Sequence, residues 1–386
     1  MSTAKAKPTA STTNLERCPK CGSTDTHYDI SEQTLRCKTC RSKWNPDTTL
    51  IAQNEVANLK GLEISAGTKD TAKKSNDQEV MTLKCKMCHA EITLALTNES
   101  TIKCHWCRHT LSVADQIQNG INPDGILPFT LTKEKAQEKI SAYLQKRRFF
   151  ASPKFVAEFS LENIYPIYLP YLIVDANLHS SHSGKAAHLV KQYSQGSDKN
   201  RRTYYDYDLY SFSRDFNLTI NDLTIEGNSN YADHNTAEST QNVINAIMPF
   251  DTKQLIPYSA QFLQGGFRSE KRNLNFADLE QVVNYQFKDI SRHQIMDKDM
   301  KQYNHGIKFE SDKVDTTGAR WVTALLPVWL YSYLEVKSNG SQLLHYICVN
   351  GRTGETCGSV PINTAKLLMT SAIIEVLALI LLVLFI

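Results

Sequence analysis

The sequence predicts an α+β protein with two N-terminal four-cysteine zinc ribbons, a mainly antiparallel α+β domain and one C-terminal transmembrane helix. Three observations support this fold class. Eight of the ten cysteines form four Cys-x2-Cys pairs, aromatic and β-branched segments flank two helical patterns, and the last twenty residues are almost entirely apolar. With 386 residues, 41% of them hydrophobic and 22% charged, the composition excludes a disordered or polytopic protein.

The cysteine pairs predict two ribbons, at 17–45 and 83–110. In both, fifteen residues separate the two pairs, and the modules are offset by 67 residues. Two such pairs supply four thiolates in a tetrahedron, and a core this small needs a metal to fold. We therefore predict two structural Zn²⁺ ions in closed coordination shells, which leave no position for a substrate. Their ligands are Cys18, Cys21, Cys37 and Cys40 in the first ribbon, and Cys85, Cys88, Cys104 and Cys107 in the second.

Four further residues carry weaker signals. His89 and His105 adjoin ligand cysteines and could bind metal or sulfur, although a surface position on the knuckle is favoured. Cys348 and Cys357 flank an Asn-Gly and Thr-Gly turn that predicts a β-hairpin. We expect these two cysteines to face each other as free thiols in the sheet.

The remaining chain divides by composition into a disordered tail at 1–16, a helix and linker at 46–82, and the α+β domain at 126–361. Apolar residues at helical spacing predict a helix capped by Thr132 and a second helix over 273–295. Aromatic and β-branched runs predict strands, which we place at 164–180, 204–225, 320–336, 343–349 and 355–360.

Catalytic motifs are absent from the sequence. There is no Walker loop, no GxGxxG after a strand, no GxSxG and no HExxH. His179, His182 and His188 fall in a segment rich in serine and glycine, which favours a solvated loop over a metal site. We expect a protein that is not an enzyme.

Nucleic-acid binding is the alternative that zinc ribbons raise. Residues 17–43 carry a charge balance of +3, which four thiolates on a zinc ion reduce to about +1. The same correction brings the second ribbon to zero. Because phosphate binding needs a clustered basic surface, we consider this partner unlikely.

The C-terminal segment 367–386 has the length of a membrane span. Twenty residues at about 1.5 Å each match a hydrocarbon core of roughly 30 Å. A buried helix is the other interpretation. Glu375 interrupts the apolar run, which suggests either a tolerated acid or contact with another membrane helix. Eight thiolates favour a reducing compartment, so we expect a single-pass protein of the inner (cytoplasmic) membrane with its N-terminal bulk in the cytoplasm.

Several segments also resemble a bacterial family. They are the N-terminal ribbons, ILPFTLTKEKA at 126–136, IYPIYLPYLIVDANL at 164–178, MPFDTKQLIPYSAQFLQGG at 248–266, and ALLPVWLYSY with VNGRTGETCGSVP. Members of this family are described as zinc-ribbon proteins of the transcription-factor-IIB type or as homologues of the primosomal helicase. Some similar membrane-attached members are linked to phage-shock-type or band-7 (SPFH) proteins in envelope-stress operons. The helicase label does not fit a chain without an ATP-binding loop.

Together these features predict a tail-anchored adaptor. The ribbons and the α+β domain would bind protein partners, and the tail would hold them at the membrane. A membrane-tethered nucleic-acid-binding protein is the alternative.

Overall fold

The structure is a computed structural model that describes residues 15, 17–45, 56–69, 79–96, 102–196, 201–229, 246–298, 300–337, 340 and 342–385. The predicted disordered tail lies outside these residues apart from Leu15, whose side chain is buried. Residues 46–55 and 70–78 of the predicted helix and linker also lie outside them. The remainder of that segment contributes strand β4 (Gly61–Ile64) and the short helix α2 (Ala66–Lys69).

One large sheet dominates the described part of the chain and contains twelve of its strands. The α+β class agrees with the prediction, but the sheet is mixed. Most neighbours are antiparallel, whereas β10 (Gly125–Ile126) and β4 run parallel to β15 (Ile307–Val336), and β14 (Arg268–Glu270) runs parallel to β11 (Ile164–Gln195). The short strand β13 (Ile256–Pro257) pairs with β10 at one margin.

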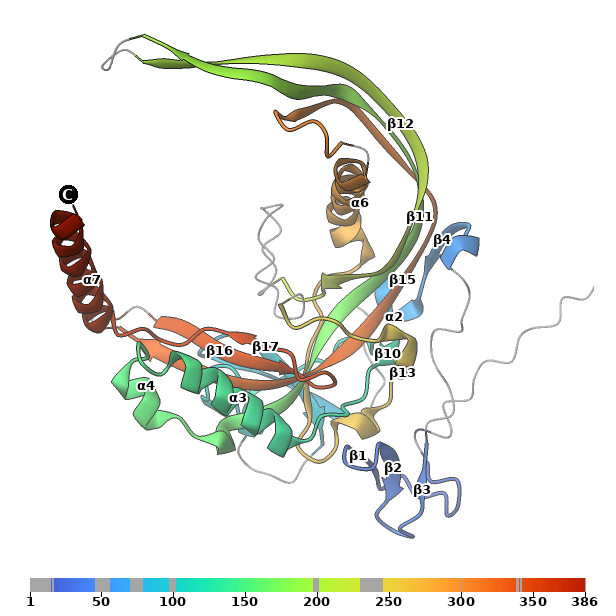
Figure 1. The fold of residues 1–386 in the computed structure, drawn as a ribbon. Helices are drawn as coiled ribbons and strands as arrows, with labels where there is room; N and C mark the ends of the chain where they lie inside the picture. Colours follow the sequence, from blue (N-terminus) through green and yellow to red (C-terminus); the bar gives the residue numbers. More distant parts are fainter. Residues whose placement is uncertain are drawn as a thin grey trace, which may run out of the picture.

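Three long strands give the molecule its curved shape (Figure 1). β11 lies between β12 (Arg202–Glu226) and β15 and pairs with both along most of its length. Its 32 residues span on the order of 100 Å. Residues 178–195, 202–218 and 307–316 form the outer part of this ribbon, which we call the arm. We call the remainder of the sheet, with its helices, the body.

Beyond the strand predicted at 164–180, the segment 181–188 is also a strand and not the loop that its composition predicts. β11 continues through it with both edges paired, so the hydrogen bonds to β12 and β15 outweigh the low strand preference of serine and glycine. Gly184 is required here because a Cβ atom would lie 2.1 Å from the carbonyl oxygen of Lys308.

The two faces of the body are both buried, which explains the nearly continuous apolar run of β15. Leu325, Trp329 and Tyr331 pack beneath helices α3 (Lys133–Arg147) and α4 (Pro153–Glu158). Leu326 and Leu330 point to the opposite face, where the second ribbon covers them. Because successive side chains of β15 point to opposite faces of the sheet, this strand contributes to a core on each face.

The predicted helices are confirmed. Thr132 precedes α3, and Ala136, Ile140 and Leu144 form its buried stripe. The helix predicted at 273–295 is α6 (Phe276–Lys298), which lies on the concave side of the curved ribbon (Figure 1). Its buried residues include Leu279, Val283 and Phe287, which share a core with Trp321 and neighbouring strand residues.

The predicted hairpin near the C-terminus is also confirmed. β16 (Gln342–Asn350) and β17 (Thr356–Gly358) are antiparallel, and Cys348 lies directly opposite Cys357. The two sulfur atoms are 3.1 Å apart and are not bonded.

Helix α7 (Thr364–Phe385) follows this hairpin and projects away from the body (Figure 1). Its window Thr364–Leu382 is 19 residues long, and none of that window is buried. A buried core helix is therefore excluded within the described structure. The helix is long and apolar enough to cross a membrane.

Candidate metal centres

All four Cys-x2-Cys pairs fold into the same knuckle. In each, the residue four positions after the first cysteine donates its backbone N–H to the carbonyl of that cysteine, at 2.8 to 3.0 Å. That residue also has a positive φ, between 60° and 72°. This turn places both sulfurs of a pair on one side of the backbone. The residues are Gly22, Arg41, His89 and Arg108.

The knuckles bring the eight predicted ligands together as two separate tetrads. Within each tetrad the Sγ atoms all lie within 4.8 Å of one another. The nearest contacts are 3.5 Å between Cys18 and Cys40 and 3.5 Å between Cys85 and Cys107. A zinc ion with bonds of about 2.3 Å holds sulfurs about 3.8 Å apart, so both sets fit tetrahedral Zn²⁺.

The first centre has an additional polar contact. The hydroxyl of Ser42 lies 3.0 Å from Sγ of Cys18 and 2.9 Å from Sγ of Cys40. A hydroxyl that donates to a thiolate stabilises its negative charge and orients the ligand. Each centre has four ligands and thus no open coordination position among the described residues.

The first ribbon is a small sheet of its own. It consists of β1 (Thr26–Asp29), β2 (Thr34–Cys37) and β3 (Lys43–Trp44). It contacts the body through the 3-10 helix η5 (Ala260–Leu263), where Tyr28 packs on Phe262 at 5.0 Å between ring centroids. The hydroxyl of Thr26 also donates to the side chain of Gln261 at 3.0 Å.

The second ribbon is built into the large sheet. Its strands β5 (Val80–Lys84) and β6 (Glu91–Ala95) form a hairpin, β6 pairs with β14, and β5 pairs with β9 (Gln116–Ile117). The other knuckle is flanked by β7 (Ile102–Lys103) and β8 (Thr110–Leu111). The described residues of this ribbon, 83–96 and 102–110, therefore share the core of the body.

His105 and Trp106 fix this second knuckle to the body. His105 is completely buried, so its predicted surface position is wrong, whereas His89 is exposed as predicted. The indole N–H of Trp106 donates to Oε1 of Glu270, and Nε2 of His105 lies 3.2 Å from the same oxygen. In addition, the hydroxyl of Ser332 donates to the carbonyl of His105 at 2.6 Å. These partners lie on the sheet, which explains the inward turn of His105.

A second buried carboxyl group lies close to Glu270. Glu226 accepts hydrogen bonds from the hydroxyl of Tyr171 and the backbone N–H of Asn228, and the Asn228 amide donates to Glu270 at 3.2 Å. Burial raises the pKa of Glu226 to about 8, with the negative charge of Glu270 adding to the rise. Glu226 is therefore protonated at neutral pH, which avoids two buried negative charges side by side.

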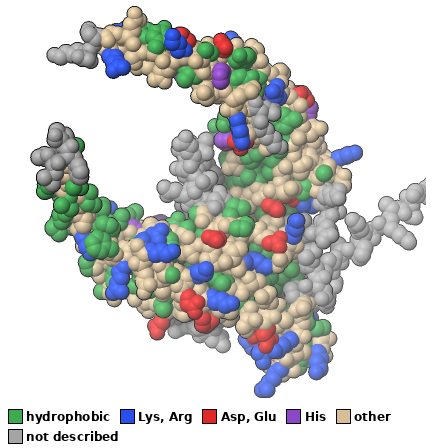
Figure 2. All heavy atoms as spheres, viewed as in Figure 1, with side chains coloured by type: hydrophobic (Ala, Val, Ile, Leu, Met, Phe, Trp, Pro, Cys, Tyr) green, Lys and Arg blue, Asp and Glu red, His purple; other side chains and the backbone are tan. Residues whose placement is uncertain are grey.

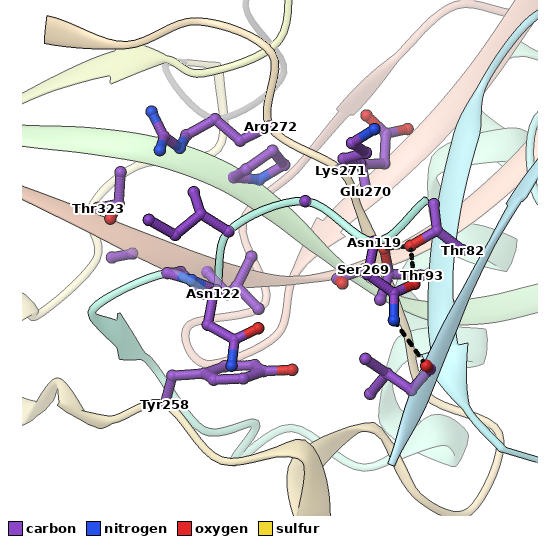
Figure 3. A pocket seen from close by; sticks show the side chains of 17 residues that line it. Thr82, Thr93, Asn119, Asn122, Tyr258, Ser269, Glu270, Lys271, Arg272 and Thr323 are labelled. Atoms are coloured by element: carbon purple, nitrogen blue, oxygen red, sulfur yellow. Dashed lines mark hydrogen bonds between the residues drawn. The ribbon is translucent and has the colours of Figure 1, made fainter. Parts of the chain in front are cut away.

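The cavity beside this cluster is too small for a metabolite (Figure 3). Its volume is about 40 Å³, enough for a few water molecules. Hydrogen bonds connect several of the groups around it. Thr82 donates to Asn119 at 2.9 Å, and Asn119 donates to the carbonyl of Val80 at 2.9 Å.

A buried Ser-His-Asp arrangement connects α6 to the arm. Nε2 of His182 lies 2.6 Å from the hydroxyl of Ser291, and Nδ1 lies 2.7 Å from Asp312. Arg292 also donates to Asp312. Ser291 is completely buried, so no substrate reaches its hydroxyl in this conformation. The arrangement is a structural network, and His179 does not join it but bonds to Asn217.

Sequence reasoning did not identify Glu226, Glu270, Ser291 or Asp312. No motif spacing marks them, because their partners come from distant segments of the chain. Glu270, for example, is 164 residues from Trp106. The pairing of β14 with β6 joins the strand of Glu270 to the second ribbon, whereas Asp312 meets His182 through the pairing of β15 with β11.

Comparison with known proteins finds a distant relative that is similar to about two thirds of the chain. Over 267 residues the chain is 23% identical to "Uncharacterized protein YdjG" of Bacillus subtilis (strain 168), and the match covers 66% of this chain and 68% of that protein. No family model matches the chain, and no solved structure matches it. The association with phage-shock-type or band-7 proteins therefore stays a prediction.

Proposed function

We propose that this protein is a tail-anchored, cytoplasm-facing zinc-ribbon adaptor that recruits protein partners to the inner membrane, in the envelope-stress setting that the family resemblance implies. The observation that carries the proposal is an apolar helix with no buried residue in its window Thr364–Leu382, attached to a fold whose two candidate metal centres are closed. Closed centres leave no coordination position for a substrate, which favours a role in holding partners in place.

The first ribbon is the better candidate for docking a partner. It forms its own sheet, and Lys20, Glu32 and Thr39 on its loops are exposed. The second ribbon shares strands with the body and presents less of its surface. We assign partner binding to ribbon one, with the body as a second surface.

The charge pattern of ribbon one favours a protein partner over nucleic acid. Three of its basic side chains pair with carboxylates of the same ribbon. Arg36 lies 3.9 Å from Asp29, Lys38 lies 3.2 Å from Asp25, and Lys43 pairs with Glu32. Such pairs leave few cations for phosphate contacts.

Affinity capture from detergent-solubilised membranes tests the proposal. Cys18→Ser/Cys21→Ser removes the first zinc, and Cys357→Ser removes a thiol outside both centres as a control. We expect partners retained by wild type and the control to be lost from the double variant. An unchanged set of partners would rule out ribbon one as the docking element. Salt-dependent retention of DNA or RNA at physiological salt would favour the nucleic-acid alternative instead.

Glu375 supplies a further test within the membrane. We propose that its carboxyl group contacts another membrane helix, because a lone acid at that depth costs about 3 kcal/mol. Replacing Glu375 with leucine should keep the protein in the membrane and remove any membrane-embedded partner from the captured set. Retention of every such partner would mean that Glu375 is merely tolerated.

A further inference from the structure

The first turn of α7 is held against the connection between α3 and α4. The backbone N–H of Asn363 donates to the carbonyl of Phe150 at 2.8 Å, and Ala151 forms an isolated β-bridge with Ile362. The ammonium group of Lys366 lies 3.7 Å from the ring centroid of Phe149. The end of α3 and the start of α7 are therefore neighbours (Figure 1).

Five basic side chains gather at this junction, and we call them the junction patch. They are Lys146, Arg147 and Arg148 at the end of α3, Lys154 in the first turn of α4, and Lys366. No acidic residue occurs between Glu138 and Glu158, or between Glu355 and Glu375. Figure 2 shows Lys and Arg side chains where α7 joins the body.

The charges of the junction patch are not neutralised within the described part of the chain. The ion pairs in that part involve other cations, such as Lys84, Lys185 and Arg320. Two of the five cations lie over aromatic rings, Arg147 over Tyr143 at 3.5 Å and Lys366 over Phe149. Such contacts orient a cation but leave its net charge in place.

Large apolar side chains accompany the charges. Phe149 is 59% exposed and Ile362 is 55% exposed, both beside the first turn of α7. Exposed aromatic and basic residues next to an apolar span match the chemistry of the lipid headgroup layer, where ring and cation both find partners.

We propose that the junction patch binds the headgroups of anionic phospholipids in the leaflet that α7 enters. This inference rests on the proposed membrane anchoring, because α7 is what places the patch at headgroup depth. Basic residues close to an anionic leaflet each strengthen the attraction about fivefold. The patch would thus select anionic lipids around the anchor and hold α3 and α4 on the membrane surface.

Quenching of a tryptophan by brominated lipids tests this proposal on the full chain. The Phe149→Trp variant provides a fluorescent side chain at the patch. It is placed in vesicles of phosphatidylcholine with a minority of phosphatidylglycerol. In one preparation the phosphatidylcholine carries bromine, and in the other the phosphatidylglycerol does. We expect stronger quenching per lipid molecule by phosphatidylglycerol. Adding Arg148→Glu/Lys154→Glu should reduce this preference at least about fivefold, and Arg148→Gln/Lys154→Gln should reduce it less.

The matched control is Lys308→Glu/Lys313→Glu, which makes the same charge change on residues of the arm, far along the chain from the patch. Zinc content verifies folding of each variant. Equal quenching by both lipids, with the protein still floating with the vesicles, would overturn the patch and leave the anchoring intact. Absence of flotation and quenching would overturn the anchoring itself. Loss of the preference on adding inorganic phosphate would indicate a site for free anions and overturn the lipid assignment.

Discussion

Asp312 is the residue on which the buried network between α6 and the arm converges. Its carboxylate accepts hydrogen bonds from His182 and Arg292, and Lys288 lies 3.6 Å away. Burial by itself would raise the pKa of Asp312, but the hydrogen bonds from Arg292 and His182 outweigh burial and lower the pKa to about 2. The ionised form is therefore the one that stabilises the fold.

The consequence is a specific loss of stability in acid. Because the pKa of Asp312 is lower in the folded chain than in the unfolded chain, its contribution is complete above about pH 4 and is lost as the pH falls toward 2. We expect the free energy of unfolding to fall by about 1 to 2 kcal/mol more in wild type than in Asp312→Asn over this window. Denaturant titrations at a series of pH values measure the difference, and loss of any metal held by the cysteine tetrads in acid would affect both proteins alike. Parallel curves would contradict the prediction.

Glu226 should have the opposite pH dependence. Its pKa is raised to about 8, mainly by burial, so the folded chain holds a proton that the unfolded chain releases above about pH 4.3. Stability therefore falls as the pH rises from that value to about 8. In Glu226→Gln this slope should be absent, with a gain of about 1 to 2 kcal/mol above about pH 8. Thermal unfolding of wild type and of Glu226→Gln at about pH 6 and about pH 9 measures this difference. If both proteins lose the same stability between the two pH values, the assignment is wrong.

The two ribbons differ as elements although their cysteine spacing is the same. Ribbon one meets the body at η5, whereas ribbon two shares strands with it and inserts Trp106 into its core. We therefore expect the loss of stability on removing a metal to depend on how the ribbon is attached to the body, and not on metal affinity alone.

Disrupting each cysteine tetrad separately tests this difference. Cys85→Ser/Cys88→Ser should destabilise the body by about 3 kcal/mol or more, because an unfolded ribbon exposes one face of the sheet. Cys18→Ser/Cys21→Ser should unfold ribbon one and leave the main unfolding transition almost unchanged. Calorimetry of both variants, with metal content determined in parallel, distinguishes the outcomes. Equal loss of stability would show that both ribbons support the body.

For the molecule as a whole, helix α7 and the fold of the body are separable. No residue of the window Thr364–Leu382 is buried, so deleting residues 364–386 removes no core contact of that window. We expect the shortened chain to move from the membrane to the soluble fraction with its unfolding midpoint unchanged. Fractionation and thermal unfolding measure the two effects, and membrane retention of the shortened chain would contradict anchoring by α7.

Much of the candidate site could be predicted from local patterns. The cysteine pairs identify both tetrads because each knuckle is made by a few consecutive residues, and the hairpin at Cys348 and Cys357 follows from its turn residues. The continuation of β11 into the arm beyond residue 180 could not be predicted, since Ser181, His182 and Gly184 have weak strand preference and become strand residues only by pairing on both edges.

Local patterns predict the cysteine ligands of both candidate metal centres, the main helices and the apolar tail, because spacing and periodicity are local properties of the chain. Folding of the whole chain joins ribbon two to the body, buries His105 and brings Asp312 to His182. It also places the end of α3 beside the start of α7. These are contacts between distant segments, and their formation depends on sheet pairing and core packing, which no local pattern records.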